Sequence, residues 1–186
     1  MSRVKFFMDT EFIEDGETIK PVSFAIVCED DCELYIEIAD VDWTKAHRWV
    51  IENVKPHLTG KSWVAPHKGY PKFEWDYPLS RSEAAGVIKD FIYVHKGRPE
   101  IWAYCGSYDW VVFAQLFGTM EDLPKGYPYF AMDVKQLAIE LGDPRIPSQS
   151  TTQHNALNDA RWTRNAYTWL RSYALAQLGK EKTVED

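Results

Sequence analysis

Four carboxylates and one histidine carry the clearest chemical signal in this chain. The segment FFMDTEF holds Asp9 and Glu11, WAYCGSYDW holds Asp109, and HNALNDA holds His154 and Asp159. Carboxylates gathered at one site repel each other unless a cation neutralises them, and hard oxygen ligands suit Mg²⁺ or Mn²⁺ better than zinc. The residue types and their order therefore predict a two-metal site that acts on phosphodiesters.

Each segment also has a plain structural explanation. Positions i and i+2 of a strand point to the same face, so Asp9 and Glu11 can present their carboxylates together, but strand ends that turn into solvent often carry acids. Asp109 follows a predicted strand at the start of a helix, where an acid also serves as a cap or dipole partner. A single histidine such as His154 is usually a solvated loop residue. The occurrence of all three segments in one chain favours a functional site over these structural explanations.

The elements that must position these residues follow from hydrophobic runs, caps and glycines. We expect strands over 4–8, 21–27, 33–38 and 100–104. We expect helices over 42–54, 80–94, 106–117, 133–142 and 155–178, with Asp42, Ser80 and Asp133 as caps. Residues 56–79 are expected to be rich in loops. Opening strands followed by mixed helices and strands predict an α/β fold, a mixed central β-sheet flanked by helices, and the order fits a ribonuclease-H-like fold.

Length and charge limit the classes of function. The chain has 186 residues, 45% of them apolar, which is enough for one domain with a normal core. Its 21 basic and 28 acidic residues give a formal net charge of -7. No overall positive field attracts a polyanion, so contact with nucleic acid must come from bound metal, local basic residues and stacking. This balance favours short or single-stranded substrates over a long duplex.

The cysteines and the N-terminal segment suggest a compartment. Cys28, Cys32 and Cys105 are odd in number, and no second cysteine pair or His-x-x-x-His completes a zinc site with the first two. A reducing cytoplasm is the simplest interpretation, with the Cys28 and Cys32 pair as structural residues. The apolar stretch at 6–8 is interrupted by Asp9, so we expect neither a signal peptide nor a membrane span.

The three acidic segments resemble a known group of enzymes. His154 stands five positions before Asp159, as in the third motif of the DEDDh group of 3′-to-5′ exonucleases. DTEFIEDG at 9–16, AYCGSYDWVVFAQLFG at 103–118 and the HxALxDAR pattern at 154–161 resemble the exoribonuclease group that contains the polyadenylate-specific RNase AS. This resemblance implies a single DEDDh exonuclease domain over 1–178, followed by a polar tail at 179–186. Homodimers are usual among similar exonucleases, so the resemblance also implies a homodimer.

The resemblance also implies a role for each residue. Asp9 would bridge two divalent ions, Mg²⁺ or alternatively Mn²⁺, about 4 Å apart. Glu11 and Asp159 would complete the ion that activates water, and Asp109 would serve the second ion directly or through water. His154 would take a proton from that water, because imidazole titrates near neutrality. The expected reaction removes nucleoside 5′-monophosphates from the 3′ end of single-stranded RNA, with adenylate-rich ends as a candidate preference.

Some aromatic and basic residues are candidates for holding the substrate. Phe12 follows the Asp-x-Glu pair and is a candidate platform for the terminal base, with a place in the core as an equal alternative. Trp110, next to Asp109, is a second candidate. The expected loop mixes basic and aromatic side chains, although ordinary loop packing is favoured for them. These side chains are Lys61, Trp63, Lys68, Tyr70, Lys72, Phe73 and Trp75.

Other functions fit the sequence less well. The nearest alternative is a DNA or short-oligonucleotide 3′-to-5′ exonuclease of the same fold. A phosphatase of the haloacid dehalogenase type needs aspartate where Glu11 stands. A non-catalytic RNA-binding module gains nothing from acids crowded beside phosphates. Serine hydrolysis is weaker still, because the chain lacks a G-x-S-x-G segment.

Overall fold

One mixed sheet forms the centre of the protein. The computed structural model describes residues 2–65 and 72–182, and the side chains of these as far as residue 178. In this part of the chain, seven strands pair in the order β5-β4-β3-β2-β1-β6-β7. β1 pairs in parallel with β6, and β6 with β7, whereas the other pairs are antiparallel. The strands are β1 Arg3–Glu14, β2 Ile19–Cys28, β3 Glu33–Glu37, β4 Ser62–Ala65, β5 Phe73–Trp75, β6 Arg98–Ala103 and β7 Met132–Asp133.

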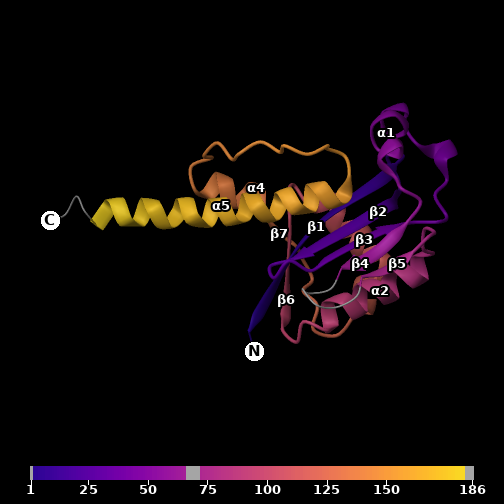
Figure 1. Ribbon diagram of the computed structural model, residues 1–186, viewed down its shortest axis with the longest axis horizontal. Coiled ribbons are helices and arrows are strands. Elements are labelled where there is room, and N and C mark those ends of the chain that lie inside the picture. The colour runs from indigo at the N-terminus through magenta and orange to yellow at the C-terminus, as the bar shows by residue number, and fades with distance from the viewer. Residues whose placement is uncertain (1, 66–71, 183–186) are drawn as a thin grey trace.

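Helices cover both faces of this sheet (Figure 1). They are α1 Arg48–Asn53, α2 Arg81–Tyr93, α3 Ser107–Phe117, α4 Val134–Glu140 and α5 Ala156–Lys182. Short 3₁₀ turns occur at 43–45, 55–57 and 120–122. α4 and α5 pack on one face and α2 and α3 on the other. This arrangement confirms the predicted α/β fold with a mixed sheet flanked by helices. No helix in the described part of the chain is both long and apolar enough to cross a membrane.

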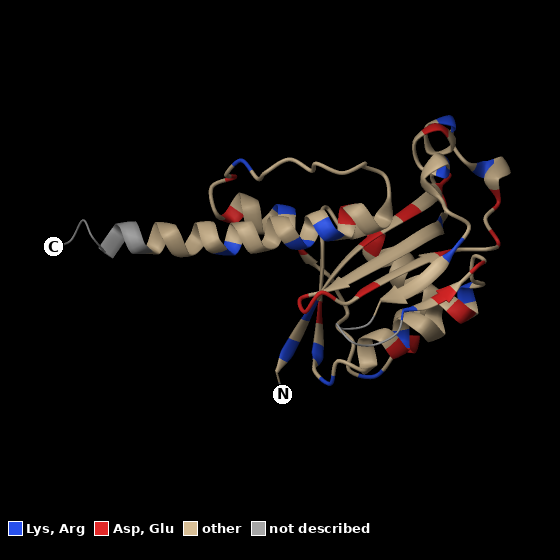
Figure 2. Ribbon diagram, in the orientation of Figure 1, with Lys and Arg blue, Asp and Glu red and all other residues tan. Residues whose placement is uncertain are grey.

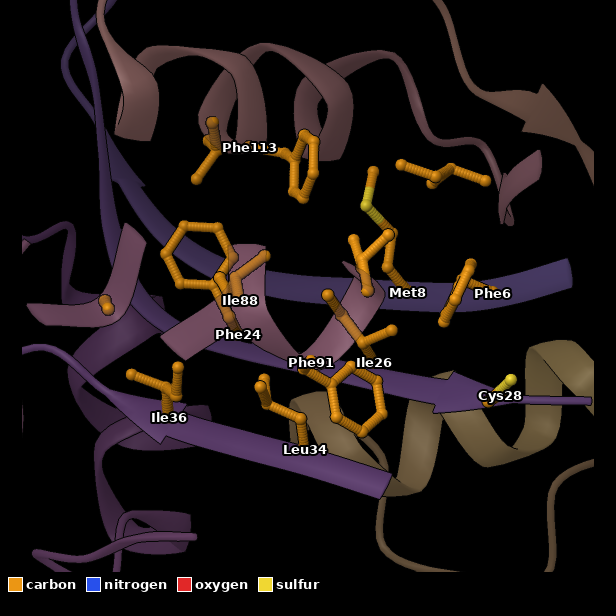
Figure 3. Packing of buried hydrophobic residues seen from close by; sticks show 14 of the residues in the cluster. Phe6, Met8, Phe24, Ile26, Cys28, Leu34, Ile36, Ile88, Phe91 and Phe113 are labelled. Carbon is orange, nitrogen blue, oxygen red and sulfur yellow. The ribbon is translucent and has the colours of Figure 1, made fainter. Parts of the chain in front are cut away.

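The alternation of side chains along β1 decides which face receives the acids. Phe6 and Met8 are buried in the main core with residues of α2 and α3 (Figure 3). Phe7 points to the other face, where it packs with residues of α4 and α5. Successive strand residues alternate between faces, so Asp9 and Glu11 follow Phe7 onto the α5 face. β1 therefore supplies core on one side and carboxylates on the other.

The predicted helix over 42–54 is divided in the structure. Asp42 accepts a hydrogen bond from the Thr44 backbone nitrogen, but it caps only the 3₁₀ turn at 43–45. The backbone becomes extended at Ala46, and α1 then begins after His47, whose ring accepts from the Trp49 backbone nitrogen. The prediction of one continuous helix was wrong because two local caps compete within a few residues. By contrast, Ser80 and Glu83 form the predicted capping box of α2, and Asp133 caps α4 as predicted.

The expectation of a loop-rich stretch at 56–79 was partly wrong. Residues 62–65 and 73–75 form the edge strands β4 and β5, which extend the sheet beyond β3. They are short, and the Trp63 ring packs at 6.3 Å from that of Tyr35 on β3, a cross-strand contact that the local sequence does not reveal. At the other end of the chain, α5 continues to Lys182, past the predicted end at 178. The rest of the predicted tail, 183–186, lies outside the described residues.

Candidate metal and catalytic site

Asp9 and Glu11 lie just beyond the point where β1 stops pairing with its parallel neighbour β6. The ladder between β1 and β6 ends at Phe7 and Trp102, and β1 continues paired only with β2. Asp9 is opposite Ala25, which packs against the first turns of α5. The start of α5 therefore lies over the same face of the sheet as both carboxylates. Figure 2 shows acidic residues on β1 and on the first turns of α5.

A tight turn between β6 and α3 brings Asp109 to the same place. A Cβ atom on Gly106 would lie 2.3 Å from the Cβ of Ala103, so only glycine fits at this position. The Gly106 nitrogen donates to the carboxylate of Asp133 at 3.0 Å, which ties the turn to the start of α4. Asp109 accepts two hydrogen bonds from Thr10, one from its backbone nitrogen at 2.8 Å and one from its hydroxyl at 2.7 Å. These bonds fix Asp109 beside the strand that carries Asp9 and Glu11.

His154 and Asp159 are held together by the loop that enters α5. His154 has a φ of 61°, a left-handed conformation that is uncommon for residues other than glycine and is often found at functional sites. Its backbone nitrogen donates to Asp159 at 2.9 Å, and the Gln149 side chain donates to the other oxygen of Asp159 at 2.5 Å. The Trp49 ring lies edge-on to the His154 ring, with centroids 4.7 Å apart.

The structure brings the predicted residues to one site. One ligand atom each from Glu11, His154 and Asp159 lies within 4.8 Å of the others. The charges of Asp109 and Asp159 act on Asp9 and on Glu11, so all four carboxylates share one electrostatic environment. Residues that are up to 150 positions apart in the chain thus form a single cluster of acids, which we call the acidic pocket.

The four carboxylates resist ionisation in this pocket. Burial, followed by repulsion from the other three acids, raises the pKa of Asp9 well above its ordinary value. Burial and repulsion from Asp159 and Asp109 raise the pKa of Glu11 to about 8. Burial also raises the pKa of Asp109, against the hydrogen bonds from Thr10, and the pKa of Asp159, against those from Gln149 and His154. The pocket is therefore short of positive charge.

This electrostatic pattern fits a cation site. In the described ranges 2–65 and 72–182, no lysine or arginine forms an ion pair with any of the four acids. Nearby basic residues on α5 are engaged elsewhere: Arg161 pairs with Glu33, and Arg164 with Asp31 at 2.6 Å. Carboxylate oxygens are the ligands that Mg²⁺ and Mn²⁺ prefer, so the donor set suits hard divalent ions.

Phe12 and Trp110, the two residues predicted to contact the substrate, both pack against the main core. The Phe12 ring stacks on that of Tyr108, with centroids 5.5 Å apart, and borders the main core. Trp110 is partly buried against the same core and stacks on Phe113 at 5.4 Å. In the predicted basic and aromatic stretch, Lys72 lies over the Trp63 ring at 4.5 Å. Of the same stretch, Lys68 and Tyr70 lie outside the described residues.

Three residues that support the site were not predicted from the sequence. Thr10 lies between the two acids of β1 and holds Asp109. Gln149 holds Asp159 from a loop that the sequence marks only as polar and rich in proline. Trp49 reaches His154 from α1, about a hundred residues away in the chain. Only Thr10 carried a usable signal, since it stands between two candidate ligands on the same strand.

The fold matches that of a solved structure of S. pombe Pop2p in its Mg2+ and Mn2+ bound form. The TM-score is 0.54 at 12% sequence identity, and the match covers 90% of this chain and 82% of the other. The mixed sheet and its flanking helices thus form the predicted ribonuclease-H-like fold.

The sequence comparisons identify the family. Residues 4–170 match the 3'-5' exoribonuclease Rv2179c-like domain. Two curated relatives from Mycobacterium tuberculosis are similar to this chain: 3'-5' exoribonuclease MT2234.1 of strain CDC 1551 / Oshkosh and 3'-5' exoribonuclease Rv2179c of strain ATCC 25618 / H37Rv. Each is 35% identical over 159 residues, which cover 85% of this chain and 88% of the relative. The chain belongs to the Rv2179c-like exoribonuclease family, and the predicted enzyme class is confirmed.

Proposed function

We propose that this chain is a divalent-metal-dependent exoribonuclease of the DEDDh type, which removes nucleoside 5′-monophosphates from the 3′ end of single-stranded RNA. The observation that carries the proposal is the approach of Glu11, His154 and Asp159 to within 4.8 Å in a pocket shared with Asp9 and Asp109. Family membership supports the exoribonuclease activity. The metal dependence and the roles of individual residues rest on the geometry and charge of the pocket.

The carboxylates would hold the metal. Asp9, Glu11, Asp109 and Asp159 are the proposed ligands, and a pair of Mg²⁺ or Mn²⁺ ions bound there would polarise the phosphodiester and lower the pKa of a bound water. The S. pombe Pop2p structure, which has the same fold, is a form with both of these ions bound. The hydrogen bonds from Thr10 and Gln149 orient Asp109 and Asp159 before any ion binds, so ligand geometry is set by the protein.

His154 is the proposed general base. One of its ring nitrogens lies within 4.8 Å of a carboxylate oxygen of Glu11 and of Asp159, so a water held by those acids would be within its reach. Imidazole is the side chain that most often serves as a general base in enzymes. The T-shaped contact with the Trp49 ring and the left-handed backbone at residue 154 restrict the orientation of the imidazole. Loss of this side chain should therefore slow turnover more than it weakens RNA binding.

The choice of nucleic acid is tested by a direct comparison. Oligonucleotides of matched sequence, one RNA and one DNA, are labelled at the 5′ end and digested in Mg²⁺ or Mn²⁺, and products are resolved by length. We expect stepwise shortening of RNA that stops with EDTA. Faster loss of DNA would contradict the RNA assignment and favour the DNA exonuclease alternative. The same assay with poly(A), poly(U) and mixed RNA tests the proposed preference for adenylate-rich ends.

We also propose a homodimer that works in the cytoplasm. The end of α5 projects beyond the sheet (Figure 1), and its side chains Leu175 and Leu178 are exposed there. A second copy of the chain would bury such apolar surface. The three cysteines, all in the described part of the chain, form no disulfide, in agreement with a reducing compartment. Light scattering that gives the mass of one chain would contradict the dimer.

A further inference from the structure

A second group of potential metal ligands lies on the opposite face of the sheet from the acidic pocket. Cys28 ends β2, Asp30 lies in the turn that follows, and His95 comes just after α2. One ligand atom from each of these three residues lies within 4.8 Å of the other two. Figure 3 shows Cys28 at the end of the row of core side chains on β2. We call these three residues the Cys28 cluster.

The His95 ring is oriented as a metal ligand would be. Its Nδ1 is 2.7 Å from the Phe91 carbonyl oxygen, which only accepts, so Nδ1 must carry the proton. In the neutral ring Nε2 then holds the lone pair, and it faces the Asp30 carboxylate at 3.7 Å. Metal-bound histidines usually donate their other N–H to a carbonyl or carboxylate in this way. Edge contacts with Phe6 and Phe91, both at 5.2 Å, restrict rotation of the ring.

The turn that supplies the other two residues is fixed by its own contacts. The Cys28 nitrogen donates to the Cys32 carbonyl at 2.8 Å, and the Asp31 nitrogen donates to the Cys28 carbonyl at 3.3 Å. Arg164 of α5 binds the Asp31 carboxylate at 2.6 Å. These bonds hold the turn closed, with Asp30 beside Cys28, whether or not a cation is present. Metal binding would therefore order little more of this turn, and its entropic cost would be small.

We propose that Cys28, Asp30 and His95 form a zinc site. A thiolate, an imidazole and a carboxylate are the donors that Zn²⁺ accepts in tetrahedral sites, whereas a thiolate is a poor ligand for Mg²⁺. Zinc bond lengths of about 2.0–2.3 Å place neighbouring ligand atoms roughly 3.3–3.8 Å apart. The cluster reaches that spacing with shifts of about 1 Å or less, and the contact between His95 and Asp30 already meets it.

The surroundings allow a cation to enter and a fourth ligand to bind. Asp30 and His95 line a cavity of about 900 Å³, as does Cys32. Cys28 is fully buried and does not line the cavity, so a bound cation would lie between it and the cavity, where a water would complete the fourth position. A bound zinc would then join the turn between β2 and β3 to the end of α2, two segments more than sixty residues apart in the chain. The site would be separate from the acidic pocket, so it does not depend on the proposed function.

Zinc binding is measured on the full-length chain in excess Mg²⁺, which occupies the carboxylate site. Zinc retained after dialysis is counted per chain, and Co²⁺ is then bound in its place. We expect one retained zinc and a near-ultraviolet thiolate-to-cobalt charge-transfer band. His95→Gln and Cys28→Ser should each weaken zinc binding by at least about 100-fold, since each removes a ligand. Cys105→Ser and His57→Gln, which change a thiol and an imidazole elsewhere, should bind as the wild type does.

The competing explanation is a buried thiol that needs no metal. It predicts no retained zinc and no charge-transfer band in the wild-type chain, and either result would overturn the proposal. A band that persists in folded Cys28→Ser would overturn it as well. If Cys28→Ser does not fold, His95→Gln decides the matter, because this variant leaves the core thiol in place. Unchanged zinc affinity in His95→Gln contradicts the site.

Discussion

The two faces of β1 differ in what they contribute to the protein. Phe6 and Met8 are each about 1% exposed and pack in the apolar core under α2 and α3. Asp9 and Glu11 point the other way, toward α5, into a pocket where burial and the charges of Asp109 and Asp159 raise the pKa of both. A single strand thus stabilises the fold with one face and concentrates negative charge on the other. Because the acidic face costs stability when no cation is bound, cation binding explains these acids better than folding does.

The largest expected effect comes from the acidic face. Asp9→Asn removes a central proposed ligand, so we expect kcat to fall at least about 1,000-fold, equivalent to roughly 4 kcal/mol of transition-state stabilisation. The melting temperature of the metal-free chain should stay the same or rise, because repulsion within the pocket decreases. Single-turnover cleavage of 5′-labelled RNA and a melting curve measure the two effects. Asp76→Asn, which changes an acid on the surface, is the matched control. Activity of Asp9→Asn within tenfold of the wild type would refute its role.

The second-largest expected effect comes from His154 and separates catalysis from RNA binding. His154→Ala removes the proposed base and leaves the four carboxylates, so kcat should fall about 100-fold to 10,000-fold with little change in KM. Steady-state kinetics in Mg²⁺ measure both constants. A variant that loses RNA affinity but keeps its turnover would assign His154 to binding instead.

The apolar face should show the opposite behaviour. Met8→Ala leaves a cavity in the core, and we expect the free energy of unfolding to fall by about 2–5 kcal/mol. Turnover per folded molecule should remain near that of the wild type, since the side chain points away from the pocket. Urea denaturation and active-site titration under folding conditions give the two values. A large loss of turnover in fully folded Met8→Ala would mean that the two faces are not independent.

The pH dependence of stability sharpens the same contrast. The pKa of Glu11 is about 8 in the folded chain, against roughly 4.3 for an unfolded glutamate. Between these values the folded state holds a proton that the unfolded state has released. In EDTA, stability should therefore fall as pH rises from about 4.3 to about 8, by up to roughly 1.4 kcal/mol per pH unit. Glu11→Gln should flatten this slope, and Mg²⁺ should reduce it. Parallel slopes for the wild type and Glu11→Gln in EDTA would show that Glu11 is not the group responsible.

The smallest expected effect concerns the hydrogen bond by which Thr10 holds Asp109 in the pocket. Thr10→Val removes the hydroxyl that donates to Asp109 at 2.7 Å but leaves the backbone hydrogen bond in place. A hydrogen bond to a carboxylate contributes about 1.5–3 kcal/mol, so kcat should fall roughly tenfold to 100-fold. Raising the Mg²⁺ concentration should restore part of the loss. Thr18→Val is a control, because its hydroxyl binds the exposed Asp15 instead.

The sequence was sufficient for the parts of the site that depend on local spacing. The i, i+2 spacing put Asp9 and Glu11 on one face. The local sequence also predicted the helix that contains Asp109 and the start of the helix that contains Asp159. It did not reveal Gln149 or Trp49, because their contacts depend on how distant segments pack. The edge strands β4 and β5 and the division of the helix after Asp42 were missed for a related reason.

The Cys28 cluster shows the same limit. Cys28 and Cys32 alone did not suggest a zinc site, because the sequence offers no further cysteine or histidine at a suitable spacing. The fold brings His95 to Cys28 from the end of α2, on the far side of a long connection. Ligands that come from distant elements leave no spacing pattern to recognise. Only the structure could place these three residues together.

The central claim is that four distant carboxylates bind the divalent ions that cleave RNA. Crystals grown with Mn²⁺ and an RNA oligonucleotide with a non-hydrolysable 3′-terminal linkage test it most directly, through the anomalous signal of the metal. We predict two manganese peaks about 4 Å apart among Asp9, Glu11, Asp109 and Asp159, with the terminal phosphate between them and His154. Ordered RNA whose terminal phosphate lies away from these acids, or a pocket without manganese beside it, would contradict the account.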